Sequence, residues 1–208
     1  RHFWPSMCLF RSLKQLEMRF DCAGVLDSNM LRSLPPQLFC LDVGLAGHVQ
    51  ITEDGLLPSL TSLAVGHSGR LKVDASLPKL RSLFLEEVHT LQLAGEQLQL
   101  PRLTWLAIGC NGGSDQVEVD FQPMPALRRL SFGGDVPVVP PDLSAASRLT
   151  SLAFHWLQPD NLAATVSMLQ QASTRLRKLE LSLGEFHQRE QQASIAAGLG
   201  PTLGRFPW

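Results

Sequence analysis

The sequence lacks an excess of charge of either sign: 18 Lys and Arg residues stand against 19 Asp and Glu residues, for a formal net charge of -1. A protein that follows a phosphate backbone needs a basic stripe. The Lys and Arg residues are scattered along this sequence, so we expect no nucleic-acid partner. The longest apolar runs are much shorter than the roughly 20 residues that cross a bilayer. We therefore expect no membrane span.

Cysteine is also scarce, and its spacing is irregular. The four cysteines are Cys8, Cys22, Cys40 and Cys110. Since no two of them form a CxxC pair, neither a zinc site nor a dense disulfide framework is indicated. An Asn-x-Ser/Thr glycosylation acceptor is absent as well. Both absences favour an intracellular location.

What the sequence does have is an apolar pattern, L-x-x-L-x-L, that recurs eight times with starts 20 to 27 residues apart. Every residue at its three marked positions is apolar, and Pro with one further residue usually precedes it. The triplets are Leu13-Leu16-Met18, Leu38-Leu41-Val43, Leu60-Leu63-Val65, Leu80-Leu83-Leu85, Leu103-Leu106-Ile108, Leu127-Leu130-Phe132, Leu149-Leu152-Phe154 and Leu176-Leu179-Leu181.

The alternation inside each unit is that of a strand with one buried face. A single strand of this length cannot cover its apolar side, so successive copies must stack as parallel strands around one core. About eleven residues into most units, pairs of apolar residues predict a second, ragged set of short strands on the opposite side, with Pro limiting their pairing. These pairs are Val49/Ile51, Leu71/Val73, Leu91/Leu93, Val117/Val119 and Val136/Val138. In the seventh unit, Leu162, Val166 and Leu169 share a helical face, which predicts a helix from about Pro159 to Ala172.

This pattern resembles the leucine-rich repeat family, and the irregular repeats are most similar to the arrays of plant and algal interaction proteins. The resemblance implies an α/β solenoid, an arc with about eight short parallel strands on its concave side and irregular short strands plus one helix on its convex side. It covers residues 10–185. We expect residues 1–9 to form an N-terminal cap and residues 186–208 a C-terminal cap and tail, because the ends of an array need covering.

Function in such a fold lies on the outward strand positions, which are mostly Ser, Ala and Gly in the middle units. Phe84 and Trp105 occupy these positions on neighbouring units, and Glu86, Arg129, His155 and the adjacent Trp156 also fall at or beside them. Aromatic residues beside charged ones are typical of interface hot spots. We predict that these residues bind a partner. The alternative is that Phe84 and Trp105 only pack together and that Trp156 turns inward to seat the helix.

Catalytic and metal chemistry find little support in the sequence. His48, His67 and His89 fall in turns at different offsets, so solvated histidines are a better interpretation than a zinc site. Cys40 has Asp42 two residues away but no His at a matching position to act as a base. The run Gly109, Gly112, Gly113 lacks the Lys and Ser/Thr of a phosphate loop. We expect no catalytic residues, no metal and no cofactor.

The sequence therefore predicts a non-catalytic module that binds a protein partner through the concave face. Two alternatives stay open at this stage. One is a substrate receptor of a ubiquitin ligase whose adaptor-binding segment would precede Arg1. The other is an accessory subunit of a large complex, contacted through its caps and convex face as well.

Overall fold

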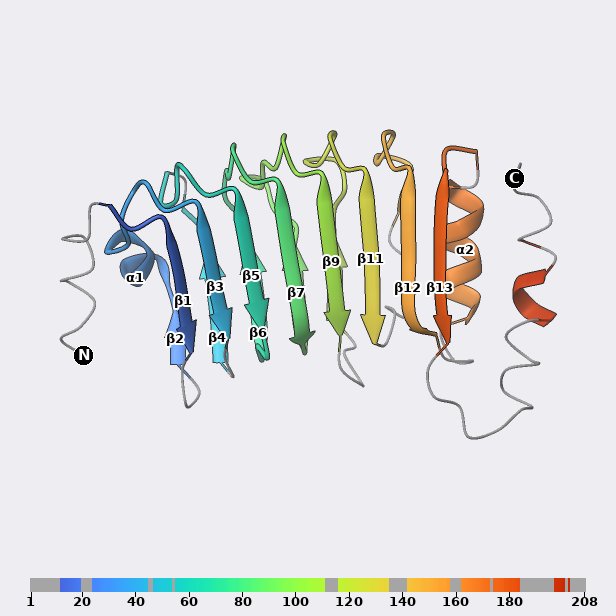
Figure 1. The fold of residues 1–208 in the computed structure, drawn as a ribbon, viewed down its shortest axis with the longest axis horizontal. Coiled ribbons are helices and arrows are strands. Elements are labelled where there is room, and N and C mark those ends of the chain that lie inside the picture. The colour runs from blue at the N-terminus through green and yellow to red at the C-terminus, as the bar shows by residue number, and fades with distance from the viewer. Residues whose placement is uncertain are drawn as a thin grey trace.

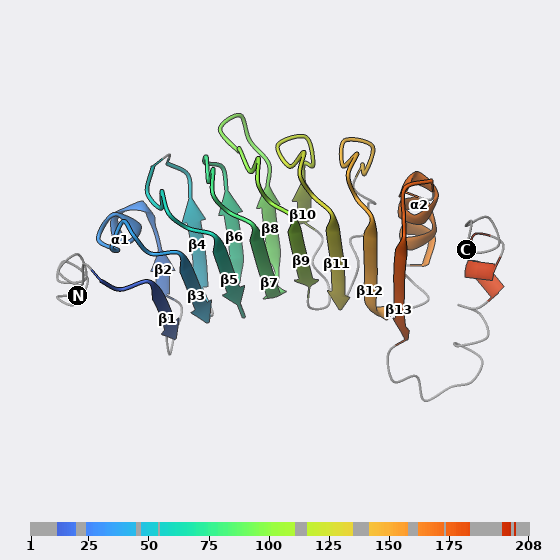
Figure 2. The same ribbon diagram turned by 45° about the horizontal axis from the view of Figure 1, so that its top comes forward.

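The structure is a computed structural model, and it describes residues 12–19, 24–44, 47–53, 55–110, 116–134, 142–157, 162–172, 174–183, 197–200 and 202. Over these residues the chain winds into a parallel-strand solenoid whose strands form two sheets, one in front of the other (Figures 1 and 2). The strands of the two sheets run in opposite directions, as the arrows in Figure 2 show. The coils that carry β1, β3, β5, β7 and β9 therefore contribute a strand to the first sheet and return through the second.

The first sheet has eight strands, all parallel, in the order β1-β3-β5-β7-β9-β11-β12-β13. Its register aligns equivalent repeat positions, so that Leu63 pairs with Leu41 on one side and with Leu83 on the other. The expected parallel stacking of the apolar triplets is confirmed. The strands are β1 (Gln15–Arg19), β3 (Cys40–Gly44), β5 (Ser62–Gly66), β7 (Ser82–Val88), β9 (Trp105–Cys110), β11 (Arg129–Gly134), β12 (Ser151–Leu157) and β13 (Lys178–Leu183).

The return segments form a second parallel sheet with the order β10-β8-β6-β4-β2. Its strands are β2 (Gly24–Leu26), β4 (Gly47–Ile51), β6 (Arg70–Val73), β8 (Thr90–Leu93) and β10 (Gln116–Val119). The expectation of ragged, poorly paired strands is wrong for these residues, because Leu71 pairs in register with both Val49 and Leu91. Prolines such as Pro78 and Pro101 lie in the turns before the first sheet, so they do not interrupt this ladder. The pair Val136/Val138 lies outside the described residues.

Within the described part of residues 12–183, two helices are present where one was expected. The predicted helix is confirmed as α2 (Leu162–Ala172), which lies next to β13, the last strand of the first sheet (Figure 1). The additional helix is the short α1 (Ser28–Arg32) near the other end of the array. It is capped by Asp27, whose carboxylate accepts hydrogen bonds of 3.0 Å from the backbone N–H groups of Asn29 and Met30.

The core lies between the two sheets and follows the apolar triplets. In the six central triplets every apolar side chain is at most 1% exposed. In the two terminal triplets only Met18 is buried, and Leu13, Leu16, Leu176, Leu179 and Leu181 are partly buried. Each end strand has one neighbour in the sheet instead of two, so its side chains have fewer groups to pack against. The centre of the array therefore carries most of the apolar burial.

Little of the proposed caps can be placed. Residues 1–9 lie outside the described residues, and of residues 186–208 the structure describes only 197–200, which are helical, and 202. In that segment Leu199 is buried, and a Cβ atom added to Gly198 would lie 2.4 Å from Cδ2 of Leu162 in α2. The segment therefore packs closely against α2, while the capping roles stay predictions. Among the described helices, none combines the length and the apolar character needed to cross a membrane.

Candidate functional site

The register of the first sheet brings the outward repeat positions into rows that run across the strands. The first row contains Gln15, Cys40, Ser62, Ser82, Trp105, Arg129, Ser151 and Lys178. The second contains Glu17, Asp42, Ala64, Phe84, Ala107, Ser131, Ala153 and Glu180. Neighbouring members of a row are about 4.8 Å apart, the spacing between adjacent strands. Residues distant in the sequence thus share one surface.

Phe84 and Trp105 are in direct contact on this surface. Their ring centroids are 4.6 Å apart, and the rings meet edge to face at 81°, a favourable arrangement for two aromatic rings. The pair is diagonal, since Phe84 aligns with the small Ala107 and Trp105 with Ser82. Trp105 nevertheless remains 39% exposed, an unusual fraction for a large apolar side chain in this structure. Phe84 therefore orients the indole without covering it.

Arg129 lies beside the indole on the next strand. It is the direct register partner of Trp105, and its guanidinium carbon is 6.0 Å from the centroid of the Trp105 ring. That distance is at the outer limit of a cation–π contact. Arg129 is exposed, so its N–H groups remain available to a ligand. Phe84, Trp105 and Arg129 form a compact group, which we call the aromatic cluster.

Glu86 does not join the aromatic cluster. It is four residues beyond Ser82, the register partner of Trp105, which corresponds to about 13 Å along the strand. A register shift follows, because Leu85 pairs with Ile108 but Val88 pairs with Cys110. Within this irregularity Glu87 adopts a positive φ of 53°, and its carboxylate contacts the imidazole of His67. Glu86 is exposed at this opposite end of the strand.

His155 and Trp156 are also separated from the aromatic cluster. His155 pairs with Gly133, four residues beyond the Arg129 level, so it too lies about 13 Å along the sheet. The backbone of Trp156 falls at the register shift between His155 and Leu157. Its side chain lies outside the described residues, so neither its predicted binding role nor an inward orientation can be assigned. Of the six residues predicted to bind a partner, the structure brings together the three of the aromatic cluster.

The surface around the aromatic cluster is built from small side chains. Ser62, Ala64 and Gly66 on β5 precede the cluster, and Ser131 and Gly133 on β11 follow it. The hydroxyl group of Ser82 donates a hydrogen bond of 3.1 Å to that of Ser62. Because these side chains are short, the backbone of a partner can approach the sheet closely next to the projecting indole.

The second row ends on β13 with Glu180, a carboxylate whose pKa is lowered. The Lys178 ammonium group donates a hydrogen bond to Glu180 and attracts it electrostatically, and His155 adds a weaker attraction; together these lower the pKa of Glu180. The two ion-pair atoms are 3.0 Å apart, and both side chains are largely exposed. Glu180 is thus already paired with a cation.

The described residues contain no group of three or more His, Cys, Asp and Glu side chains able to hold a metal ion. Of the three histidines predicted to lie in turns, His67 follows β5 and His89 precedes β8, but the prediction is wrong for His48, which lies within β4. Cys40 has a free thiol and aligns with Gln15 and Ser62, neither of which is a base. Gly112 and Gly113 lie outside the described residues.

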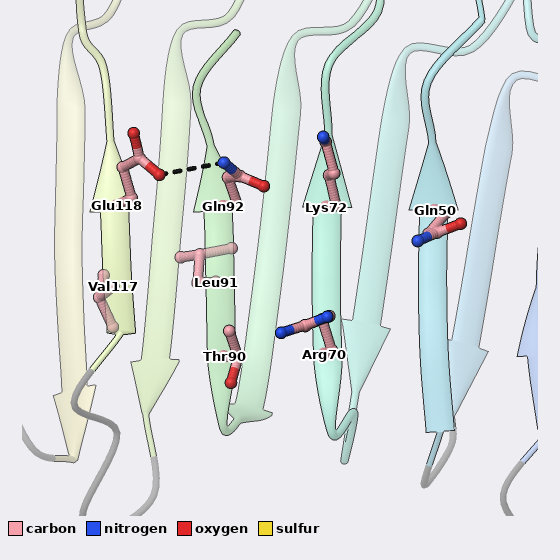
Figure 3. Close-up of a pocket in the computed structure, with 8 residues that line it drawn as sticks. All are labelled: Gln50, Arg70, Lys72, Thr90, Leu91, Gln92, Val117 and Glu118. Atoms are coloured by element: carbon pink, nitrogen blue, oxygen red, sulfur yellow. Dashed lines mark hydrogen bonds between the residues drawn. The ribbon is translucent and has the colours of Figure 1, made fainter.

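The second sheet carries a shallow groove that sequence reasoning did not identify as a surface (Figure 3). Its volume is about 540 Å³, and it is lined by Gln50, Arg70, Lys72, Thr90, Leu91, Gln92, Val117 and Glu118. The amide of Gln92 donates a hydrogen bond of 3.1 Å to Glu118. The sequence did contain a sign of this surface, because one polar residue separates the two apolar residues of each of the return strands β4, β6, β8 and β10. The lining is polar and lacks an exposed aromatic ring, so it is the weaker candidate for protein binding.

No protein-family model matches the sequence, and no curated protein or solved structure is significantly similar to the chain. The assignment of the parallel-strand solenoid therefore depends on the strand pairing of this structure alone.

Proposed function

We propose that the chain is an irregular leucine-rich repeat protein that binds a protein partner through the outward face of its first sheet, the expected concave face, without catalysis or a cofactor. The aromatic cluster carries this proposal. Trp105 is held edge to face by Phe84, keeps 39% of its surface exposed and has Arg129 beside it. Trp and Arg are enriched among the residues that contribute most to the affinity of protein interfaces.

The repeat pattern supports the assignment to leucine-rich repeats. Leucine-rich triplets recur every 20 to 27 residues, and their side chains form the buried side of one parallel sheet. The opposite side of that sheet is outward and is formed mainly by Ser, Ala and Gly around Trp105. A rigid sheet that presents one exposed aromatic side chain on a floor of small residues suits the capture of a protein surface.

The test is affinity capture from the native source with three forms of the full chain, namely wild type, Trp105→Ala and Lys72→Ala. The Lys72→Ala change is the matched control, because it alters a side chain on the second sheet. Captured proteins are quantified by mass spectrometry, and the affinity of each purified candidate is then measured by calorimetry.

We expect Trp105→Ala to weaken partner binding by at least about 30-fold, the effect of losing a hot-spot residue, while Lys72→Ala binds as wild type does. The melting temperature of Trp105→Ala should fall by no more than about 4 °C, since the side chain is already partly exposed. Binding that survives Trp105→Ala but is lost with Lys72→Ala would place the interface on the second sheet. A large drop in melting temperature would show that Trp105 mainly supports the fold.

A further inference from the structure

Exposed cations gather at one edge of the first sheet, where the chain enters strands β7, β9, β11, β12 and β13. We call this the entry edge; it is the upper edge of the sheet in Figure 1, since the strands point downward. All of its Lys and Arg residues are exposed except Arg175, which is partly buried. The exposed cations are Lys79, Arg81, Arg102, Arg128, Arg129, Arg148, Arg177 and Lys178.

Backbone hydrogen bonds hold this edge in register. The N–H of Thr104 donates to the carbonyl of Arg81 at 2.9 Å, and the N–H of Arg128 donates to Thr104 at 3.0 Å. The ladder continues from Thr150 to Arg128 at 3.0 Å and from Arg177 to Thr150 at 2.8 Å. Arg81, Arg128 and Arg177 therefore occupy alternate rungs, about 10 Å apart, over a span of about 19 Å.

The exposed cations are concentrated from β7 onward. In the other direction the same ladder continues from Arg81 to the uncharged residues Thr61 and Phe39 and then to a single exposed lysine, Lys14, before β1. The charge is thus concentrated on the strands that carry the aromatic cluster and on those that follow it.

Most of these cations have no acidic partner within the described part of the chain. Lys178 pairs with Glu180, but no described carboxylate lies within 4.0 Å of the charged atoms of Arg81, Arg128 or Arg177. The aspartates of the turns before β7 and β11 accept backbone hydrogen bonds: Asp74 accepts the N–H of Gln97 at 3.0 Å, and Asp120 accepts that of Gln122 at 2.9 Å.

The carboxylate of Asp142, in the turn before β12, accepts the N–H of Ser144 at 2.8 Å. Glu96 is exposed, and together with Asp74, Asp120 and Asp142 it makes four acids in these turns against the eight exposed cations of the edge. The edge therefore presents positive charge to solvent, and a ligand of opposite charge would complement it.

An apolar anchor lies on the same edge. Trp105 directly follows Thr104, the rung between Arg81 and Arg128, and it is the first residue of β9. Its exposed indole is flanked by the Arg129 guanidinium group. A ligand that follows the basic edge therefore meets an aromatic side chain one rung from Arg81, between Arg81 and Arg128.

We propose that the partner docks through an extended acidic segment along the entry edge, with carboxylates opposite Arg81, Arg128 and Arg177 and an apolar side chain against Trp105. This inference rests on the proposed function and names the chemistry of the partner. At about 3.3 Å per residue, six extended residues cover the 19 Å span. Arg is well suited to the task, because its planar guanidinium group pairs with a carboxylate through two parallel hydrogen bonds.

A peptide explains these features better than a single-stranded nucleic acid does. Proteins that bind single strands offer several aromatic side chains on which successive bases stack. Among the described residues, Trp105 is the one aromatic ring that is exposed on this edge. The chain as a whole has a net charge of -1, so its field does not favour polyanions in general.

The inference is tested by fluorescence anisotropy with the full chain and a labelled eight-residue peptide of glutamates around one central leucine. Two further probes serve as comparisons: the same peptide with glutamine in place of glutamate, and a labelled oligothymidylate of similar charge. The variants are the double change Arg128→Glu with Arg177→Glu, the single change Trp105→Ala, and Lys72→Glu as the matched charge reversal on the second sheet. Circular dichroism and thermal melting check that each variant folds.

The acidic peptide should bind the wild-type chain, and its affinity should fall at least tenfold with the double change and with Trp105→Ala but less than twofold with Lys72→Glu. The glutamine peptide should bind at least tenfold more weakly than the acidic one. Equal affinity for the glutamine peptide, or tighter binding of the oligothymidylate, would overturn the proposal. If Trp105→Ala abolishes capture of the native partner while the double charge reversal leaves it intact, protein binding through the sheet stands and the acidic segment is wrong.

Discussion

Phe132 and Phe154 stack within the core, with ring centroids 5.6 Å apart and ring planes inclined by 14°. They occupy the same repeat position on β11 and β12, and both are at most 1% exposed. The Phe132→Ala change should destabilise the fold by about 3–5 kcal/mol, because it removes the stacking partner and leaves a cavity. Ser131→Ala, one residue away on the outward side, should change the free energy of unfolding by less than about 0.5 kcal/mol. Urea unfolding of both variants measures the difference, and equal losses would mean that the faces of β11 are misassigned.

The cost of removing a repeat leucine should depend on its position in the array. Leu63, on a central strand, is 1% exposed, whereas Leu179, on the end strand β13, is only partly buried. Leu63→Ala should therefore cost about 2–5 kcal/mol and Leu179→Ala clearly less. Chemical denaturation of the two variants gives the comparison. An equal or larger loss at Leu179 would show that the end of the array is covered more completely than its exposure indicates.

Gly95 should not tolerate any side chain. Its φ is 149°, and a Cβ atom there would lie 2.1 Å from Oδ1 of Asp74, the acceptor for the N–H of Gln97. Gly95→Ala would strain the backbone and break this turn, with an expected loss of more than about 2 kcal/mol. Gly66→Ala is the matched control, since nothing lies within 4 Å of its added Cβ atom. Thermal melts should separate the two variants, and a harmless Gly95→Ala would contradict the described turn.

The pKa of Glu180 should depend on Lys178. The hydrogen bond and charge of Lys178 lower the pKa of Glu180 in the folded chain, so their stabilising effect is present above the unfolded pKa and is lost as the pH falls through the folded value. Lys178→Met should raise the pKa of Glu180 toward its ordinary value in a carboxyl NMR titration. The pKa of Asp142, which is lowered by hydrogen bonds from Ser144, is the internal control and should not move. An unchanged Glu180 would show that the ion pair does not form in solution.

Much of this architecture could be predicted from the sequence because burial imposes a period on it. The spacing of apolar residues predicts the strands that carry the triplets, the return strands β4, β6, β8 and β10, and the helix α2. The strand β2 and the helix α1 were missed because three and five residues are too few to show a period. The capping residue Asp27 was a signal for α1, but it had no repeated counterpart to draw attention to it.

The candidate site was only partly predictable, for a different physical reason. The contact of Phe84 with Trp105 follows from adjacent strands in register, so the repeat pattern was enough to anticipate it. Register shifts after Leu85 and after His155 are local backbone features that no repeat spacing encodes. The basic entry edge escaped notice because its members fall at several repeat positions and alternate with uncharged rungs such as Thr104. Only the stacking of the strands brings them together.

Binding through this face requires that residues far apart in the sequence lie on one edge of one parallel sheet, and a distance measurement tests that requirement directly. Spin labels are attached to cysteines introduced at Arg81 and Arg177, in a full chain whose four native cysteines are replaced by serine. Double electron–electron resonance should give one narrow distribution near 20 Å, corresponding to four steps between strands. A separation of twice that value, or a distribution without a defined maximum, would contradict the stacked sheet and remove the surface on which both proposals depend.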